Sequence, residues 1–314
     1  MIWGAIVVAA GRGERFGGPK QLVEVAGRPL VAWSLAAFSA MPEILELAIA
    51  TEPEHVARMM ELAAEFAPRL AVRVVPGGAT RQDSVRAALG ALPERCGATF
   101  VHDGARPLIL PRDVRAGMRA VRAGVASLLA APVVDTIKVV GAEDRKVLRT
   151  LDREQLWAAQ TPQFALTREL RRAHGDALRY ERHATDDATL LERAGLDVIV
   201  VPASGENFKV THPADRERAE AILRARPLLG PTEDETLLVE AFVEARAVES
   251  VSRELESRGR LDGIDRELPR GAAIRAFVDA ERLRGFAERF AELAGVEAIF
   301  TTHQAHDVAG APGT

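Results

Sequence analysis

The sequence AIVVAAGRGERFGGPKQ occupies residues 5–21 and decides the class of fold. It opens with an apolar run that has the length and composition of a buried β-strand. Glycines follow directly, and glycine-rich loops after a strand let backbone N–H groups approach phosphate oxygens. Pro19 interrupts the helix that a dinucleotide-binding loop requires, and Gln21 follows Lys20 where a Walker A loop has serine or threonine. The stretch therefore predicts a phosphate-binding loop of another type.

Short apolar runs and amphipathic stretches alternate through the first 226 residues. This alternation predicts an α/β fold with a mostly parallel, Rossmann-like sheet and helices on both faces. Thr80 and Asp83 form the pattern of a helix capping box. Ligands of such sheets bind at the carboxyl ends of the strands, so the chemistry is expected just after each strand. Strands are predicted at 5–9, 45–50, 71–75, 99–102, 127–132 and 198–201, and helices at 54–65, 81–92 and 114–122.

Two interruptions of the alternation predict an arm and a second part of the chain. Residues 135–140 and 146–151 flank a Gly-Ala-Glu-Asp turn with no room for a crossover helix, which predicts a protruding β-hairpin arm. Residues 227–231 hold two prolines and a glycine and are typical of a linker. We therefore expect a catalytic domain over residues 1–229 and a mainly helical C-terminal extension over residues 230–314, whose function the sequence does not indicate.

Composition excludes several classes of partner. The net charge is −4 and the pI is near 6.0, so nothing in the charge balance favours nucleic acid or a membrane surface. No apolar run approaches the ~18 residues of a transmembrane helix. Cys96 is the one cysteine of the sequence, which rules out an intrachain disulfide and indicates a reducing compartment. We expect a soluble cytoplasmic protein that binds neither nucleic acid nor membranes.

Further loops after predicted strands carry glycine or charge. Residues 76–85 place paired glycines after a strand, where the backbone can approach a base or a ribose. Asp103 ends another strand and suits Mg²⁺, which takes one or two protein carboxylates and leaves its other positions to water and phosphates. Lys209 follows the last predicted strand. With Arg15 and Lys20 of the first loop, these residues predict one cationic pocket at the edge of the sheet.

The chemistry of such a pocket follows from what the sequence lacks. It contains no nucleophile elbow with Ser-His-Asp order, and no paired cysteine or histidine spacing typical of zinc before residue 230. A phosphate monoester is already ionised and needs no general base to attack the α-phosphorus of a nucleoside triphosphate. The enzyme has mainly to align anionic groups and neutralise charge, for which Arg, Lys and Mg²⁺ suffice. The sequence therefore favours nucleotidyl transfer to a phosphorylated acceptor.

A series of short motifs also resembles a known family in order and spacing. The series is similar to the 2-C-methyl-D-erythritol 4-phosphate cytidylyltransferases, enzymes of the non-mevalonate route to isoprenoid precursors, over residues 2–226. The resemblance implies transfer of CMP from CTP to 2-C-methyl-D-erythritol 4-phosphate with release of pyrophosphate. It also implies Mg²⁺ or another divalent cation, and a homodimer in which residues 135–153 reach across to the partner copy. The motifs are Ala9-Ala10-Gly11-Arg12-Gly13-Glu14-Arg15, Pro19-Lys20-Gln21, Arg81-Gln82-Asp83-Ser84-Val85, Val101-His102-Asp103-Gly104-Ala105-Arg106-Pro107, Asp135-Thr136-Ile137-Lys138, Gln160-Thr161-Pro162-Gln163, Thr185-Asp186-Asp187 and Asn207-Phe208-Lys209-Val210-Thr211.

The resemblance further implies a role for each matching residue. The catalytic residues, which grip the triphosphate or position the reactants, would be Arg15, Lys20, Arg153 and Lys209. The nucleotide would be lined by Ala9, Ala10, Gly11, Gly13, Gly78 and Ser84. The acceptor would be surrounded by Arg106, Thr136, Thr161 and Thr185, together with Arg153. Asp103 would serve the metal.

Some features depart from the family pattern. Residues 102–104 read His-Asp-Gly where His-Asp-Ala is more frequent, and Ala79 stands where some members carry an acidic residue beside the base. The second departure leaves the selectivity for the base open. The sequence after residue 230 has no counterpart in the ordinary enzyme, and it does not resemble the cyclodiphosphate synthase domain that is sometimes fused at this end.

Three other functions are compatible with parts of the pattern. A ribitol-5-phosphate cytidylyltransferase would share most of these loops and differ in the acceptor pocket. A molybdopterin guanylyltransferase would share the first loop but not the Thr-Pro-Gln or Asn-x-Lys segments. A non-catalytic nucleotide-binding regulator is the alternative from a different class, and the presence of Arg15, Lys20, Asp103 and Lys209 argues against it.

Overall fold

The computed structural model describes residues 1–11, 13 and 16–225. The chain divides into two units between Arg226 and Pro227, and the described residues all belong to the first unit. Arg15 and the predicted extension over residues 230–314 lie outside the described residues. Their predicted roles, and the boundary expected at residue 229, therefore stay predictions.

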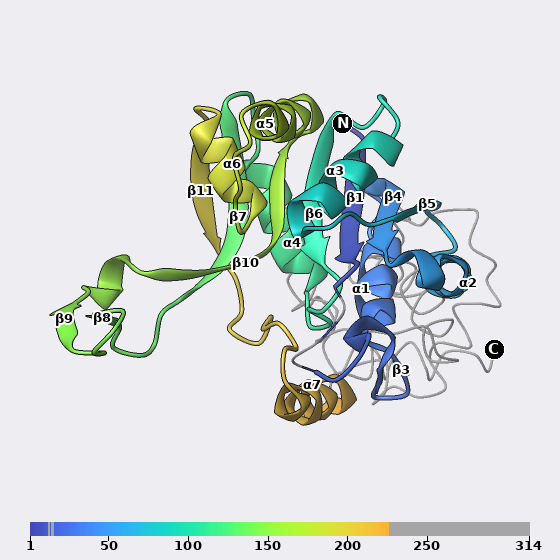
Figure 1. Cartoon of the computed structure of the whole chain (residues 1–314). Helices are drawn as coiled ribbons and strands as arrows, with labels where there is room; N and C mark the ends of the chain where they lie inside the picture. The colour runs from blue at the N-terminus through green and yellow to red at the C-terminus, as the bar shows by residue number, and fades with distance from the viewer. Residues whose placement is uncertain (12, 14–15, 226–314) are drawn as a thin grey trace, which may run out of the picture. The chain divides into compact units, whose positions relative to one another are not determined.

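A seven-stranded sheet forms the centre of the molecule, in the order β11-β7-β10-β6-β1-β4-β5 (Figure 1). Neighbouring strands are parallel except around β10, which runs antiparallel to both β6 and β7. The predicted α/β fold with a mostly parallel sheet is confirmed, and every predicted strand lies within an observed one. The strands are β1 (Trp3–Ala9), β4 (Ile44–Thr51), β5 (Ala71–Pro76), β6 (Ala98–Asp103), β7 (Val125–Pro132), β10 (Trp157–Leu166) and β11 (Asp197–Pro202).

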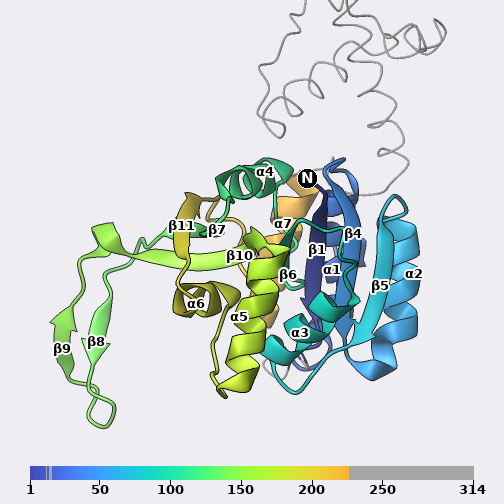
Figure 2. The same ribbon diagram turned by 90° about the horizontal axis from the view of Figure 1, so that it is seen from above.

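Helices cover both faces of this sheet (Figures 1 and 2). Side chains of β1 alternate between the two faces, so Val7 packs in one core with α1, α2 and α4, whereas Ile6 packs in the other with α3, α5 and α6. None of the helices in the described ranges is long and apolar enough to cross a membrane. The helices are α1 (Leu30–Ser39), α2 (Val56–Phe66), α3 (Arg81–Ala91), α4 (Pro111–Ala120), α5 (Thr167–Arg179), α6 (Asp187–Arg193) and α7 (Pro213–Ala225).

The predicted helices are present, but some of them begin or end at other residues than predicted. The capping box before α3 is confirmed, because Thr80 Oγ1 accepts from Asp83 N at 3.1 Å and the Asp83 carboxylate accepts from Thr80 N at 3.3 Å. The start predicted at residue 114 was wrong, because α4 begins at Pro111, whose fixed φ angle suits the first helical position. In α2, the buried residues Met59, Leu62 and Phe66 recur at the expected helical spacing.

Two elements have no signal of their own in the sequence. Every residue of α1 is buried, so this helix has no polar face and no amphipathic period. Strand β10 contains Gln160, Thr161 and Gln163, which read as a polar loop in one dimension. In the fold these three side chains are buried, at 6%, 4% and 2% exposure, and they bond to Asn207, Asp103 and Asp186 of neighbouring segments.

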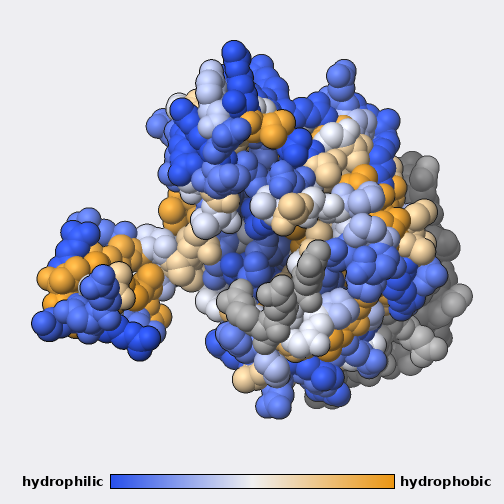
Figure 3. Space-filling model, viewed as in Figure 1, coloured by the Kyte–Doolittle hydropathy of each residue, from blue (hydrophilic) through white to orange (hydrophobic). Residues whose placement is uncertain are grey.

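The predicted β-hairpin arm is confirmed. Strands β8 (Lys138–Val140) and β9 (Val147–Thr150) pair antiparallel and extend away from the sheet on a stalk that continues β7 and β10 (Figures 1 and 2). The arm carries exposed apolar side chains, among them Val147 at 59% and Leu148 at 67% exposure. Figure 3 shows that hydrophobic residues are gathered on the arm, with hydrophilic residues among them.

Packing between α4 and β10 generates a prediction about stability. A Cβ atom added at Gly117 would overlap with the ring of Phe164, whereas one added at Gly175 of α5 would meet open space. We expect Gly117→Ala to lower the free energy of unfolding by about 1–3 kcal/mol through overpacking. The matched control Gly175→Ala should raise it by about 0.5–1 kcal/mol, because alanine is the better helix former. Urea unfolding followed by tryptophan fluorescence measures both, and a stabilised Gly117→Ala would contradict the packing described.

Candidate active site

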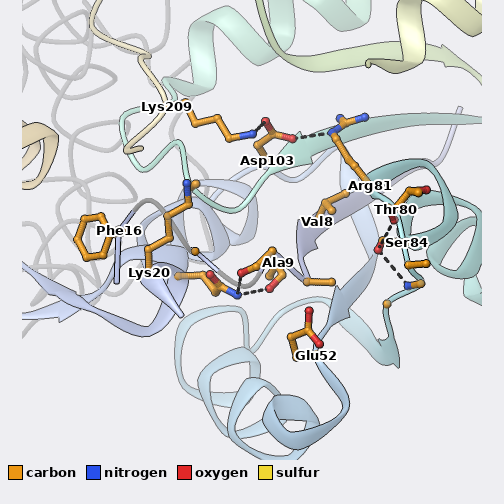
Figure 4. A pocket seen from close by; sticks show the side chains of 18 of the residues that line it. Val8, Ala9, Phe16, Lys20, Glu52, Thr80, Arg81, Ser84, Asp103 and Lys209 are labelled. Atoms are coloured by element: carbon orange, nitrogen blue, oxygen red, sulfur yellow. Dashed lines mark hydrogen bonds and ion pairs between the residues drawn. The ribbon is translucent and has the colours of Figure 1, made fainter. Parts of the chain in front are cut away.

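A pocket opens at the carboxyl ends of β1, β4, β5 and β6, where the sequence predicted the chemistry (Figure 4). Segments after each of these strands meet there and are joined by Lys209 and Thr211 from the segment after β11. The loops that the sequence singled out are therefore brought together. The lining residues are Val8, Ala9, Ala10, Gly11, Gly13, Phe16, Lys20, Gln21, Glu52, Pro53, Gly77, Gly78, Ala79, Thr80, Arg81, Ser84, Asp103, Ala105, Lys209 and Thr211.

The glycine loop after β1 is shaped by its own backbone and by one buried side chain. Gly13 has a positive φ of 66°, and its carbonyl oxygen accepts from the N–H groups of Phe16, Gly17 and Gly18. The Gln21 side chain donates from Nε2 to the carbonyl oxygens of Ala9 and Gly11. Gln21 was quoted with the first loop but given no role by the sequence. Its buried amide holds the two ends of the loop together.

One end of the pocket is lined mainly by glycine, alanine and serine, and Glu52 lies beside them (Figure 4). A Cβ atom at Gly77 would overlap with that of Ala10, so the backbone of this segment passes close to the end of β1. Ser84 Oγ accepts from Gly78 N at 3.1 Å and donates to Thr80 O at 2.9 Å. Ser84 is therefore committed to the glycine segment, which it fastens to the start of α3. The predicted nucleotide-lining residues Ala9, Ala10, Gly11, Gly13, Gly78 and Ser84 all lie in this pocket.

The other end of the pocket is charged. Asp103, at the last position of β6, receives Arg81 Nε on Oδ1 at 3.0 Å and Lys209 Nζ on Oδ2 at 2.8 Å (Figure 4). Burial by itself would raise the pKa of Asp103, but Arg81 and Lys209 outweigh it and hold that pKa well below its usual range. Lys20 lies across the pocket and donates from Nζ to Val210 O at 2.8 Å. An ionised carboxylate is thus surrounded by cations.

A layer of polar side chains supports Asp103 from inside the fold. Asp103 N donates to Thr161 Oγ1 at 3.0 Å, and this hydroxyl lies 3.2 Å from His102 Nδ1. The other ring nitrogen, Nε2, lies 3.2 Å from Ser34 Oγ and 3.1 Å from Arg106 O. His102 is fully buried, and this burial lowers its pKa to about 4, so the imidazole is neutral at pH 7.

The predicted acceptor-binding residues do not line the pocket of a single copy. Arg106 is turned toward the segment before Lys209 and donates from Nη1 to Asn207 O at 2.8 Å, while Thr161 supports Asp103. Thr136, Arg153 and Thr185 are exposed. Arg153 donates to Val134 O at 3.0 Å at the base of the arm. The structure therefore brings together the predicted nucleotide residues with Lys20, Lys209 and Asp103, but not the acceptor residues.

Two further residues of the site had no predicted role. Arg81 lies at the first position of α3 and forms ion pairs with Asp103 and Asp187. Asn207 donates from Nδ2 to Gln160 Oε1 at 3.0 Å and to Thr161 O at 2.9 Å, which ties the Lys209 segment to β10. Both residues lie within motifs already quoted from the sequence. Only their contacts with distant segments identify what they do.

A divalent cation fits the donor set at Asp103. Each carboxylate oxygen has two lone pairs, so Asp103 can keep its contacts to Arg81 and Lys209 and still offer a lone pair to a cation. The described residues contain no group of three or more His, Cys, Asp or Glu side chains that could hold a metal. A site with a single protein carboxylate suits Mg²⁺ that is held mainly by substrate phosphates.

Comparison with known proteins agrees with this geometry. The family model of 2-C-methyl-D-erythritol 4-phosphate cytidylyltransferase (IspD) matches residues 3–225. The chain belongs to this family. The cytidylyltransferase of Gloeobacter violaceus is 42% identical over 223 residues, which cover 70% of this chain and 96% of that protein. The one from Pelotomaculum thermopropionicum is 42% identical over 225 residues, 71% of this chain and 94% of the relative.

Solved structures of the family share the fold. The crystal structure of the Thermus thermophilus cytidylyltransferase is 35% identical, with a TM-score of 0.57, and the match covers 71% of this chain and 100% of that chain. The 4-diphosphocytidyl-2C-methyl-D-erythritol synthase of Anaerococcus prevotii has a TM-score of 0.64 at 28% identity, over 71% of this chain and 98% of that chain. The resemblance predicted from the motifs is confirmed, and with it membership of a nucleotidyltransferase family.

The buried neutral His102 generates a prediction about pH. Its folded-state pKa of about 4 lies below that of an exposed histidine, ~6.5, so below pH 6.5 the unfolded chain binds the proton more readily. Stability from this residue should be complete above pH 6.5 and be lost as the pH falls toward 4, by about 3 kcal/mol in all. Urea unfolding between pH 7 and 5 measures the slope. His102→Gln should flatten it, and the exposed control His183→Gln should not. Equal slopes for all three proteins would contradict the assignment.

Proposed function

We propose that this chain transfers CMP from CTP to 2-C-methyl-D-erythritol 4-phosphate and releases pyrophosphate, in the synthesis of isoprenoid precursors. The observation that carries the proposal is one pocket with two unlike ends. A glycine-lined end, with Glu52 among its neighbours, is joined to a charged end that holds Lys20, Lys209 and the Arg81–Asp103 pair. The first end suits a pyrimidine nucleoside and the second suits a triphosphate.

The composition of the pocket supports attack by a nucleophile that is already ionised. Its described lining contains no histidine or cysteine. A phosphate monoester needs no proton removed before it attacks the α-phosphorus, so the protein has to align the reactants and stabilise the charge that develops. Lys20 and Lys209, which both line the charged end, would bind the phosphates, and the resemblance implies the same role for Arg15. Such donors stabilise the transition state most when they are already in place.

Asp103 would hold the divalent cation, which we propose to be Mg²⁺. A bound cation would shield the negative charge on the triphosphate. Arg106, Thr136, Thr161, Thr185 and Arg153 would surround the acceptor, as the resemblance implies. Thr161 would act through the backbone of Asp103, to which its hydroxyl is bonded at 3.0 Å.

Two alternatives remain distinct from this proposal. A ribitol-5-phosphate cytidylyltransferase would use the same nucleotide end with another acceptor. A non-catalytic nucleotide-binding regulator would keep the pocket without turnover. The ordered pair Asp103–Lys209 and the buried supports behind it favour an enzyme, because a binding module does not require a cation held so closely at the reacting end.

We also propose a homodimer in which the arm of one copy completes the site of the other. The exposed apolar area on the arm supports this, because such areas on soluble proteins mark contact surfaces. So does the position of Thr136 and Arg153, on or beside the arm and outside the pocket of their own copy. We further propose that the protein is cytoplasmic and that residues 1–229 form its catalytic domain.

The activity is tested by pyrophosphate release from CTP. We expect release with 2-C-methyl-D-erythritol 4-phosphate and Mg²⁺, little with ribitol 5-phosphate, and none with free methylerythritol, which lacks the ionised nucleophile. Lys209→Ala serves as the control against a contaminating enzyme and should raise the barrier by about 2–4 kcal/mol. Faster release with ribitol 5-phosphate would establish the first alternative. Tight CTP binding without release would establish the second.

The shared site is tested by mixing inactive copies. Lys209→Ala disables the pocket and Arg153→Glu disables the arm, so random pairing should restore roughly one quarter of the sites, because half of the dimers are mixed and each has one intact site. Lys20→Ala with Lys209→Ala is the matched control, because both lysines line the pocket of one copy and mixed dimers then have no intact site. Restored activity in the control pair only, or in neither pair, would refute a site completed by the partner's arm.

A further inference from the structure

Charged side chains of alternating sign run from the pocket into the core. Lys209 contacts Asp103 at 2.8 Å, Asp103 contacts Arg81 at 3.0 Å, and Arg81 Nη1 contacts Asp187 Oδ2 at 2.8 Å. Beyond this charged series, the ring Nε2 of His174 lies 2.9 Å from Asp187 Oδ1. The first three residues line the pocket, whereas Asp187 and His174 lie outside it and are 1% and 2% exposed.

Stability alone does not account for such a series. Burying ion pairs requires removing the charges from water, and well-packed apolar side chains of the same volume are often equally stabilising. A buried carboxylate behind a pocket instead defines the position of the cation that it holds. Burial alone would raise the pKa of Asp187, but the Arg81 guanidinium and the bond to His174 outweigh this and lower it, so the carboxylate stays ionised.

We infer that Arg81 is a positioning residue for the proposed transfer. Asp187 anchors its guanidinium from the core, and Arg81 in turn holds Oδ1 of Asp103. The other oxygen, Oδ2, faces Lys209 at 2.8 Å and Arg106 at 4.0 Å, and it would also serve the proposed cation. The inference deepens the proposed function and rests on it. It assigns Asp187 and His174, which do not line the pocket, to the support of the same site.

Arg81 and its partner Asp187 are both held in place by the secondary structure around them. Arg81 opens α3 directly after the Thr80–Asp83 capping box. Asp187 opens α6, where its backbone N–H donates to Gln163 Oε1 at 2.9 Å. Gln163 also accepts from Ala188 N at 2.8 Å, so β10 fixes the start of α6. The distance between the two carboxylates that Arg81 spans is therefore set by secondary structure, not by a mobile loop.

Arginine is required here because of its shape. Its planar guanidinium carries donors that point in different directions, so Nε serves Asp103 while Nη1 serves Asp187. A lysine ammonium is a single point charge and cannot occupy both places. Without Arg81, the ammonium of Lys209 would be the closest cation left on Asp103. It would then be held more tightly by the carboxylate and less available to a phosphate.

The test compares Arg81→Lys, Asp187→Asn and the unchanged full-length chain in two measurements. The first is CTP binding by calorimetry with and without Mg²⁺ and with no acceptor present, so that no turnover contributes. The second is kcat for CMP transfer. We expect Arg81→Lys to lose about 10- to 100-fold in kcat and most of the gain in CTP affinity that Mg²⁺ confers, as for other residues that orient a metal ligand. Asp187→Asn, which is nearly isosteric, should lower kcat and the Mg²⁺-dependent gain in CTP affinity as well, but by a smaller factor than Arg81→Lys.

A double variant separates positioning from general damage. Asp187 acts through Arg81, so Arg81→Lys with Asp187→Asn should be no worse than Arg81→Lys alone. Arg171→Gln is the structural control, because Arg171 lies on α5 with His174 and donates to Leu92 O at 2.7 Å, away from the pocket. It should lower the melting temperature and leave the Mg²⁺-dependent gain unchanged.

The outcomes distinguish this inference from the proposed function. If both single variants stay within about twofold of the unchanged chain in kcat and in the Mg²⁺-dependent gain in CTP affinity, Arg81 is not a positioning residue. The same conclusion follows if the Arg171→Gln control loses this gain in CTP affinity to the same extent as Arg81→Lys. An unchanged chain that binds CTP with Mg²⁺ but never releases pyrophosphate would refute the proposed function, while the calorimetric comparison would still decide the role of Arg81. Should Arg81→Lys fail to fold, the nearly isosteric Asp187→Asn carries the same comparison.

Discussion

The ionised carboxylate of Asp103 is the charge on which the rest of the site depends. It is 7% exposed, so it is stable only with cations close by. Arg81 from the start of α3 and Lys209 from the segment after β11 supply them. Parts of the chain more than a hundred residues apart are thereby joined at one strand end, as the separation of Lys209 and Asp103 by 106 positions illustrates. The same contacts that neutralise the carboxylate create the cationic end of the pocket.

The glycine-lined end of the pocket is shaped by the backbone. There, Gly77 passes so close to Ala10 that a side chain would not fit, and Ser84 fastens the glycine segment to the start of α3. That surface is shaped by the absence of side chains, whereas the charged end is shaped by long ones. A substrate with a flat uncharged head and a polyanionic tail is the kind of molecule that matches both ends.

Much of the fold follows from local patterns that a one-dimensional reading can detect. Apolar runs, glycine positions and a capping box marked the strands, the loops and the start of α3, because these features depend on neighbours a few residues away. Helix α1 and strand β10 carried no such signal. A helix buried on all sides lacks an amphipathic period, and β10 owes its polar residues to the site that it supports. Neither element can therefore be predicted without knowing which residues surround it in the fold.

The class of fold, the protruding arm, the glycine loop after β1 and the family could all be predicted from the sequence, because these reside in residue types and short spacings. Which charges meet could be learned only from the folded chain. It showed that Thr161 supports Asp103 from behind, that Ser84 shapes the glycine segment, and that Arg81 joins Asp103 to Asp187. The physical reason is that Coulomb and hydrogen-bond energies depend on distances of a few ångströms between segments far apart in the chain, and a linear pattern does not contain those distances.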